Sequence, residues 1–422
     1  MNLLIQLQLS NYDKKGRWIL ECDSGYQMCI GRVRHLLKLK PDIVIDILGP
    51  KRDTLITQPE SISPDIFTNV NVNWIEIDLI PNAIITRFDF DFDNIAASIK
   101  NLNKYDVVLI NDPMLLRHYK ALFALKSKVK PRFVVHSHFI DNPECPKFPD
   151  DTSLWMGQLE AAYKADFNFW QCESSMNIFF QSASKWLDKS KLDVIKAKSL
   201  PWDDGYSKSE ITSSYNIANV RFNINKLKEL RKNSVVIFVP NRVGGKGRSS
   251  DYTNCGKFLF DLLPRIRKRY SGNLTIIAGN PSQKFSNDEL ETECNTLNLV
   301  PDTFNRDELK VIMQHSHIVV ALYNQDTYGG TAVREAIELG CVPMWLNMNE
   351  YAKLSKKSNF KLLIKKNFSN IVPMSLRLFK AVKGDNKSFQ KCMTKLRLIN
   401  RKQCSYESTT RTVMKHLFGR KK

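Results

Sequence analysis

Residues 317–346 contain the feature that most constrains the fold, a run that predicts a strand, a glycine turn, a helix and a second strand in direct succession. The first apolar run is strand-sized, and Gly329-Gly330 allows the backbone to turn sharply into a helix with apolar residues at helical spacing. Gly340 and Pro343 end that helix before the second apolar run. Because the free N–H groups in the first turn of such a helix form a natural anion site, this unit predicts a phosphate-binding pocket.

The same alternation of strands and helices occurs in two separate stretches of the chain. Strand-sized apolar runs alternate with helical patterns in the first half, and after a segment without a strong period the alternation starts again. With 422 residues, 43% of them apolar, the chain can bury two cores. We therefore predict an α/β protein of two doubly wound, Rossmann-like domains that face a central cleft. Its predicted parts are a domain over 1–200, a linker over 201–233, a domain over 234–385 and basic helices over 386–422.

Composition and cysteine usage are typical of a cytoplasmic globular protein. No apolar run approaches the ~18 residues of a membrane helix, and the first residues lack the basic segment and cleavage site of a signal peptide. The nine cysteines are an odd number without a C-x-x-C pair, so we interpret them as reduced thiols and propose no metal site. The expectation is a cytoplasmic protein without a membrane span.

The net charge of +20 is concentrated near the C-terminus. Residues 351–422 contain 20 Lys and Arg against 2 Asp and Glu, whereas the rest of the chain is nearly balanced. A surplus confined to one segment fits an acidic, phosphate-rich partner, and it fits a merely solvated lysine-rich face equally well.

Polar residues follow predicted strands at two further places. Arg242 and Lys246 lie in a glycine-rich loop after the first strand of the second domain, where Arg can bind phosphate oxygens with two hydrogen bonds and Lys adds a mobile charge. The loop lacks the spacing of a P-loop, so alone it is a weak signal. His136 and His138 end another strand, and Asp141 can orient an imidazole, act as a base or simply open a turn.

The second half of the chain resembles the donor domain of GT-B glycosyltransferases, in particular the retaining families with an E-x7-E motif. Glu335 and the following Ala-Ile-Glu-Leu-Gly-Cys-Val-Pro match the second Glu of that motif and its tail. The resemblance implies that Glu335 hydrogen-bonds the ribose of a nucleotide sugar and that the amides of Gly329 and Gly330 meet its diphosphate. Thr327 stands where the family has its first acidic residue. The likeness covers residues 234–346 well and the first half only in layout.

The same resemblance assigns roles to the other polar residues. Arg242 and Lys246 match the family's Arg and Lys pair that neutralises the diphosphate, although they stand four residues apart rather than five. His138 or His136, with Asp141 nearby, corresponds to the catalytic-face histidine that contacts the transferred sugar. A structural role for either histidine is the alternative.

Two more features of the family have counterparts here. Gly25 and Tyr26 precede the first helix, where related enzymes place a small-residue loop beneath the donor phosphate and the acceptor. Asp23 in the same stretch is expected to be the N-cap of that helix. The final helices of GT-B proteins commonly cross back toward the first domain, which would bring the basic 386–422 segment beside the cleft.

The predicted function is transfer of a sugar from a nucleoside-diphosphate sugar, with a UDP-sugar favoured, to a hydroxyl acceptor. No D-x-D motif stands where a metal-held diphosphate would need it, which predicts a metal-independent site without a further cofactor, and retention of configuration is implied by family likeness. The basic 351–422 segment favours a hydroxymethylated base in DNA as the acceptor, as in phage enzymes of this fold, which would act in the host cytoplasm. The alternatives are a polysaccharide, lipid-linked or protein acceptor, and a non-catalytic nucleic-acid-binding protein, motivated by Thr327.

Overall fold

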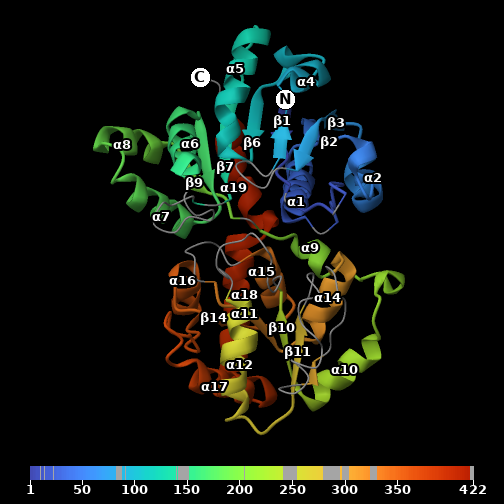
Figure 1. Ribbon diagram of the computed structural model, residues 1–422, viewed down its shortest axis with the longest axis vertical. Coiled ribbons are helices and arrows are strands. Elements are labelled where there is room, and N and C mark those ends of the chain that lie inside the picture. Colours follow the sequence, from blue (N-terminus) through green and yellow to red (C-terminus); the bar gives the residue numbers. More distant parts are fainter. Residues whose placement is uncertain are drawn as a thin grey trace. The chain divides into compact units, whose positions relative to one another are not determined.

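The computed structural model describes residues 1–418 except 10, 14, 22, 82–87, 91, 139, 141–151, 204, 241–253, 279–294, 297–303 and 324–329. The chain forms two compact units, both drawn in Figure 1. Unit 1 consists of Met1–Asp204 and Tyr406–Lys422, and unit 2 consists of Gly205–Ser405. The chain therefore passes between the units twice, after residue 204 and after residue 405.

Unit 1 is built on a seven-stranded sheet in which all neighbouring strands are parallel, in the order β3-β2-β1-β6-β7-β8-β9. Its strands are β1 (Asn2–Gln6), β2 (Val44–Pro50), β3 (Val72–Ile77), β6 (Val107–Ile110), β7 (Arg132–Ser137), β8 (Phe167–Trp170) and β9 (Ser199–Pro201). The order runs outward from β1 in both directions, which defines a doubly wound sheet with its switch point between β1 and β6. A separate antiparallel pair joins β4 (Leu79–Pro81) to β5 (Phe88–Phe90).

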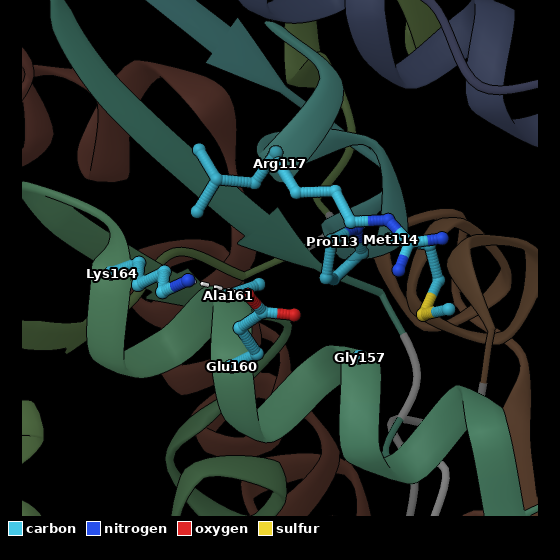
Figure 2. A pocket seen from close by; sticks show the side chains of 8 residues that line it. Pro113, Met114, Arg117, Gly157, Glu160, Ala161 and Lys164 are labelled. Atoms are coloured by element: carbon cyan, nitrogen blue, oxygen red, sulfur yellow. Dashed lines mark hydrogen bonds and ion pairs between the residues drawn. The ribbon is translucent and has the colours of Figure 1, made fainter. Parts of the chain in front are cut away.

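Helices connect the parallel strands of unit 1, because a parallel pair needs a crossover. They are α1 (Ser24–Leu39), α2 (Pro59–Ile62), α3 (Pro64–Phe67), α4 (Phe92–Ser98), α5 (Leu116–Lys126), α6 (Thr152–Lys164), α7 (Glu173–Ala183) and α8 (Lys189–Ala197), with 3-10 turns η1 (Arg52–Thr54), η2 (Leu102–Lys104) and η3 (Pro113–Leu115). A small pocket lies between the start of α5 and the helix α6 (Figure 2). Its lining includes Met114 and Arg117 on one side and Gly157, Glu160 and Lys164 on the other.

The last helix of the chain, α19 (Tyr406–Phe418), packs against α1 within unit 1. Gly31 of α1 permits this contact, because a Cβ there would lie 2.3 Å from the ring of Tyr406. One turn further along α1, His35 Nε2 lies 3.6 Å from Glu407 Oε1. The C-terminal end of the chain therefore completes the unit that its N-terminal half begins.

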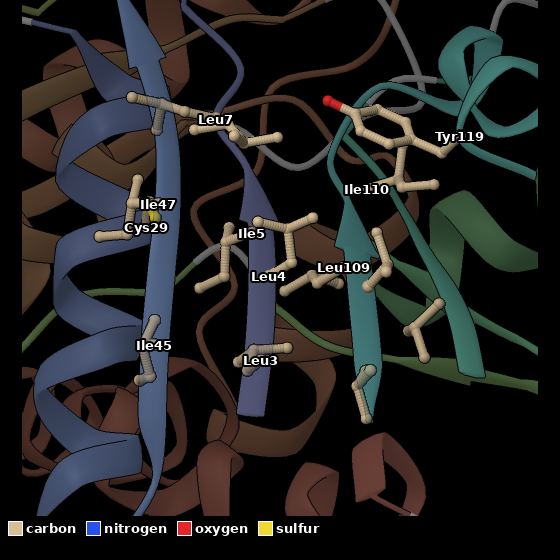
Figure 3. Packing of buried hydrophobic residues seen from close by; sticks show 14 of the residues in the cluster. Leu3, Leu4, Ile5, Leu7, Cys29, Ile45, Ile47, Leu109, Ile110 and Tyr119 are labelled. Atoms are coloured by element: carbon tan, nitrogen blue, oxygen red, sulfur yellow. The ribbon is translucent and has the colours of Figure 1, made fainter. Parts of the chain in front are cut away.

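The core of unit 1 sits on both faces of its central strands. Figure 3 shows Leu3, Leu4 and Ile5 of β1 between side chains of β2 and β6. All five residues of β1 except the first are buried, as expected of a strand covered by helices on both faces. The apolar runs in the sequence are therefore continuous rather than alternating.

Unit 2 contains a second, five-stranded parallel sheet in the order β12-β11-β10-β13-β14. Its strands are β10 (Val235–Val239), β11 (Leu274–Ala278), β12 (Asn295–Thr296), β13 (Ile318–Ala321) and β14 (Val342–Trp345). Its helices are α9 (Lys208–Ile211), α10 (Ile224–Asn233), α11 (Cys255–Lys257), α12 (Leu263–Arg267), α14 (Arg306–His315), α15 (Thr331–Glu338), α16 (Asn349–Ser358), α17 (Ile371–Lys383) and α18 (Lys387–Cys404), with the 3-10 turn η4 (Ile217–Asn219) and a π-helical segment η5 (Phe258–Leu262).

The predicted fold class, an α/β protein with two doubly wound parallel sheets, is confirmed. Of the predicted linker over 201–233, residues 205–233 contain α9, η4 and α10 and belong to unit 2, whereas the residues before them belong to unit 1. Of the basic helices over 386–422, α18 lies in unit 2 and α19 in unit 1. In the described part of the chain, no helix has the length and apolar character to cross a membrane.

Replacing Gly25 with Ala is expected to destabilise unit 1, because the added Cβ would lie 1.9 Å from the backbone oxygen of Gln8. We expect the free energy of unfolding in urea to fall by about 1–3 kcal/mol. Gly157→Ala is the matched control, since its Cβ would meet the Sδ atom of Met114 at 2.0 Å, at the end of a flexible side chain. A loss for Gly25→Ala no larger than that of the control would contradict the backbone clash.

Candidate functional site

The start of helix α15 occupies the edge of unit 2 at which ligands bind in open parallel sheets, beyond the carboxyl ends of the strands. Gly330 is the N-cap of this helix and has φ +75°, a conformation that L side chains rarely adopt. A Cβ at this position would also lie 2.9 Å from the hydroxyl of Tyr323. The structure thus explains why a glycine precedes the helix. Gly329 and Thr327 lie outside the described residues, as do Arg242, Lys246 and Asp141.

Glu335 lies in the second turn of α15 and is 2% exposed. Its carboxylate accepts two hydrogen bonds from Arg306, with Nη1 at 2.8 Å from Oε2 and Nη2 at 2.5 Å from Oε1. Arg306 is the first residue of α14, and its Nε donates to Oε1 of Glu210 at 3.1 Å. Burial lowers the pKa of Arg306, but the charges of Glu335 and Glu210 outweigh it and raise that pKa above its usual value. The predicted ribose ligand is therefore one member of a Glu–Arg–Glu triad.

Two further polar residues of α15 fix the helix against its surroundings. Glu338 accepts from the hydroxyl of Tyr206 at 2.8 Å and from Nη2 of Arg401 in α18 at 2.5 Å. Arg334 donates to Oδ1 of Asn400 at 3.2 Å, and the amide of Asn400 donates to the carbonyl of Arg334 at 3.0 Å. Burial, and next to it the charge of Glu338, raises the pKa of Tyr206. The helix that presents Glu335 is thus held by hydrogen bonds to two other parts of unit 2.

The two predicted histidines of unit 1 lie together at the carboxyl end of β7. His136 is fully buried, and its Nε2 lies 3.0 Å from Nη2 of Arg32 and 3.2 Å from the carbonyl of Trp202. Its Nδ1 lies 3.3 Å from Nε2 of His138, which is 7% exposed. Burial, then the charges of Arg32 and His138, holds the pKa of His136 well below its ordinary range. His136 is therefore a neutral core residue, and the catalytic role of His138 stays a prediction.

The loop before α1 has a capping arrangement. Asp23 is buried and accepts from the amides of Gly25 at 2.8 Å and Tyr26 at 3.0 Å, which confirms the predicted N-cap. The Tyr26 side chain is fully buried, with its hydroxyl 3.3 Å from Oγ of Ser63. The backbone amides of Gly25 and Tyr26 both donate to Asp23, and the Tyr26 ring lies in the core. In this structure neither residue therefore presents its amide or its side chain to a phosphate.

Arg306 and Glu210 were not predicted from the sequence. Arg306 stands 29 residues before its partner Glu335 and 96 residues after Glu210, so no local spacing relates the three. A basic residue at the first position of a helix opposes the helix dipole, which was the one available hint that Arg306 has a specific partner.

The pocket between α5 and α6 is a weaker candidate for the functional site than the start of α15. The pocket between α5 and α6 contains none of the predicted site residues, and its Lys164 is paired with Glu160 at 2.6 Å (Figure 2). Within the described ranges, no group of three or more His, Cys, Asp or Glu could hold a metal ion.

In sequence, no protein-family model matches the chain, and no curated protein matches it either. In structure, the chain is similar to Anabaena HepE in complex with UDP and glucose, with 12% identity, 99% of both chains covered and a TM-score of 0.64. It is also similar to sucrose-phosphate synthase from Thermosynechococcus elongatus, with 12% identity, 98% of both chains covered and a TM-score of 0.66. A third neighbour is the catalytic domain of starch synthase IV from Arabidopsis thaliana bound to ADP and acarbose, with 10% identity, 99% of this chain and 98% of that chain covered and a TM-score of 0.61.

Identities this low show the fold alone, and they show it over the whole chain. The two parallel α/β units form the GT-B fold.

The buried state of His136 predicts a pH dependence. In the unfolded chain this imidazole takes up a proton as the pH falls through about 6.5, whereas the folded protein keeps it neutral. The free energy of unfolding should therefore fall below that pH, by up to about 1.4 kcal/mol per pH unit from this residue. His136→Gln should show a shallower dependence between about pH 7 and pH 5. An imidazole NMR signal of His136 that titrates at or above its ordinary midpoint would contradict this assignment.

Proposed function

We propose that this chain is a glycosyltransferase that moves a sugar from a nucleoside-diphosphate sugar, with a UDP-sugar favoured, to a hydroxyl acceptor. The observation that carries the proposal is the start of α15, where Gly330 begins the helix and Glu335 follows in the next turn at the ligand-binding edge of a GT-B domain. Structural neighbours in complex with UDP-glucose and with UDP support a nucleotide sugar as the donor.

The chemistry matches this arrangement. In the transfer, the bond between the anomeric carbon and the diphosphate oxygen breaks, the acceptor oxygen forms the new bond, and the acceptor hydroxyl loses its proton. Negative charge builds up on the departing diphosphate, and free N–H groups at a helix N-terminus stabilise such charge. Arg242 and Lys246 would add positive charge beside it, Gly329 its backbone amide, and Thr327 would stand near the sugar. We propose a metal-independent, retaining transfer with no cofactor besides the donor.

The residues that we propose for the acceptor side of the reaction belong to unit 1. His138 is the residue we propose for contact with the transferred sugar, with Asp141 as its partner or as the base toward the acceptor hydroxyl. His136 contributes from the core by holding the ring of His138 through the contact between Nδ1 and Nε2.

A screen of nucleotide sugars against a small set of acceptors tests the enzyme activity directly. Mass spectrometry should detect sugar transfer or slow donor hydrolysis, and Glu335→Gln should lower kcat/KM by about tenfold or more, because one charged hydrogen bond is worth roughly that factor. Glu308→Gln is the control, since Glu308 is another buried glutamate of unit 2 paired to an arginine, Arg221. If no donor is consumed, the chain is the alternative non-catalytic binding protein.

Helix α18 favours a polyanionic acceptor. Lys387, Lys391 and Lys395 are exposed and recur every four residues, so they form one row along a helix that contains no Asp or Glu. None of the ion pairs in the described part of the chain involves these three lysines. Like charges at this spacing repel, and phosphates of a nucleic acid would relieve that repulsion.

On this basis we propose hydroxymethylated bases in DNA as the acceptor, reached by flipping the base from the duplex. A saccharide acceptor is the second candidate. It is favoured by the neighbours whose names describe sucrose-phosphate and starch synthesis.

The α18 lysines should determine the salt dependence of DNA binding. Replacing Lys387, Lys391 and Lys395 with Gln should reduce the slope of log K against log salt by up to about 3, because each lost phosphate contact removes nearly one unit. The matched control replaces the exposed Lys189, Lys191 and Lys196 of α8, a helix that also contains Asp193. Equal slopes for the two triple variants, or transfer to saccharides and none to DNA, would rule out the DNA acceptor.

A further inference from the structure

The Glu210–Arg306–Glu335 triad of unit 2 contains an arginine that no motif of the sequence identifies. Its geometry rests on three hydrogen bonds, two from the Nη atoms to Glu335 and one from Nε to Glu210. A role for this arginine in ligand binding rests on the proposed function, in which Glu335 binds the ribose of a nucleotide.

Burial makes Glu335 dependent on Arg306. The Glu335 side chain is 2% exposed, whereas those of Arg306 and Glu210 are 25% and 27% exposed. A buried carboxylate is stable only when it is paired and hydrogen-bonded. Since Arg306 is the more exposed partner, a ribose that reaches Glu335 does so beside the guanidinium.

The Glu335 carboxylate, although bonded to Arg306, can still accept two hydrogen bonds from a diol. An ionised carboxylate has about four lone-pair sites, two on each oxygen, and Arg306 uses one on each oxygen. One site on each oxygen remains, and the 2′- and 3′-hydroxyls of ribose are two adjacent donors. Because the guanidinium is planar and binds with two bonds, it also fixes the plane of the carboxylate.

We propose that Arg306 is a positioning residue for nucleotide recognition, which holds the carboxylate of Glu335 in the orientation that accepts both ribose hydroxyls. Glu210 supports it by holding the Nε edge of the same guanidinium. Lys310, one turn further along α14, is buried and donates to Oγ of Ser213 at 3.2 Å, whereas Arg306 donates to both carboxylate oxygens of Glu335. Arg306 therefore sets the preference for a ribonucleotide over its 2′-deoxy form.

The same helix provides a matched control. Glu308 of α14 is fully buried and accepts from Arg221, with Nε at 2.8 Å and Nη2 at 2.7 Å. This second pair also joins an arginine with two bonds to a buried glutamate in unit 2, but it is not at α15. Arg221→Lys therefore reproduces the structural cost of losing a bidentate pair without touching Glu335.

The experiment measures dissociation constants for UDP and ADP and for their 2′-deoxy forms. Wild type should bind one ribonucleotide about tenfold or more tightly than its deoxy form. Arg306→Lys, which keeps the charge and loses the planar fork, should lose most of that preference while affinity for the deoxy form stays unchanged. Glu335→Gln should do the same, and the double variant should show no further loss. Arg221→Lys should keep the wild-type preference.

Three outcomes would overturn the proposal. In the first, Arg306→Lys prefers the ribonucleotide over its 2′-deoxy form as strongly as the wild-type protein does. In the second, the affinities of Arg306→Lys for the two forms fall equally, as in a purely structural defect. In the third, the losses of affinity of the two single variants add up in the double variant. If Arg306→Lys fails to fold, Arg306→Gln is measured instead, since its amide can still donate to one carboxylate oxygen. If the wild-type protein binds no nucleoside diphosphate, the proposed function itself is wrong. If the wild-type protein binds and Arg306→Lys keeps the preference for the ribonucleotide, only the role of Arg306 is wrong.

Discussion

Two carboxylates on one short helix constrain the arrangement of unit 2. Glu335 and Glu338 lie three residues apart on α15, and each would cost several kcal/mol if it were removed from water without a partner. Arg306 meets the first, while Arg401 and Tyr206 meet the second. Because these contacts tie α14, α18 and the segment before α9 to α15, the place of the candidate nucleotide site is set by ion pairs as well as by apolar packing.

The same network reaches both points where the chain changes unit. Tyr206 lies two residues after the first crossing, and Ser405 lies directly before the second. The two residues form a β-bridge, with the amide of Tyr206 donating to the carbonyl of Cys404 at 3.2 Å. Since the hydroxyl of Tyr206 donates to Glu338, the helix that carries Glu335 and the two crossing points share one hydrogen-bonded network.

Local signals predicted local structure well. The strand–turn–helix–strand run around Gly330 became β13, α15 and β14, and Asp23 became the N-cap of α1, because both depend on neighbours in the chain. The residues that sequence reasoning missed have distant partners. Arg306 meets Glu335 from another helix, and Arg32 meets His136 from 104 residues away. Likewise, the residues around Tyr26 did not indicate that its side chain would be buried beside Ser63, which stands 37 residues later in the chain.

By itself the sequence determined the fold class, the strand–turn–helix–strand succession around α15 and the glycine that begins that helix, since periodicity and turn chemistry act over a few residues. Only the tertiary structure decided that Glu335 is buried against Arg306, that His136 is a neutral core residue and that α19 belongs to unit 1. These outcomes depend on which distant groups share a low-dielectric interior, where a charge is kept only with its partner.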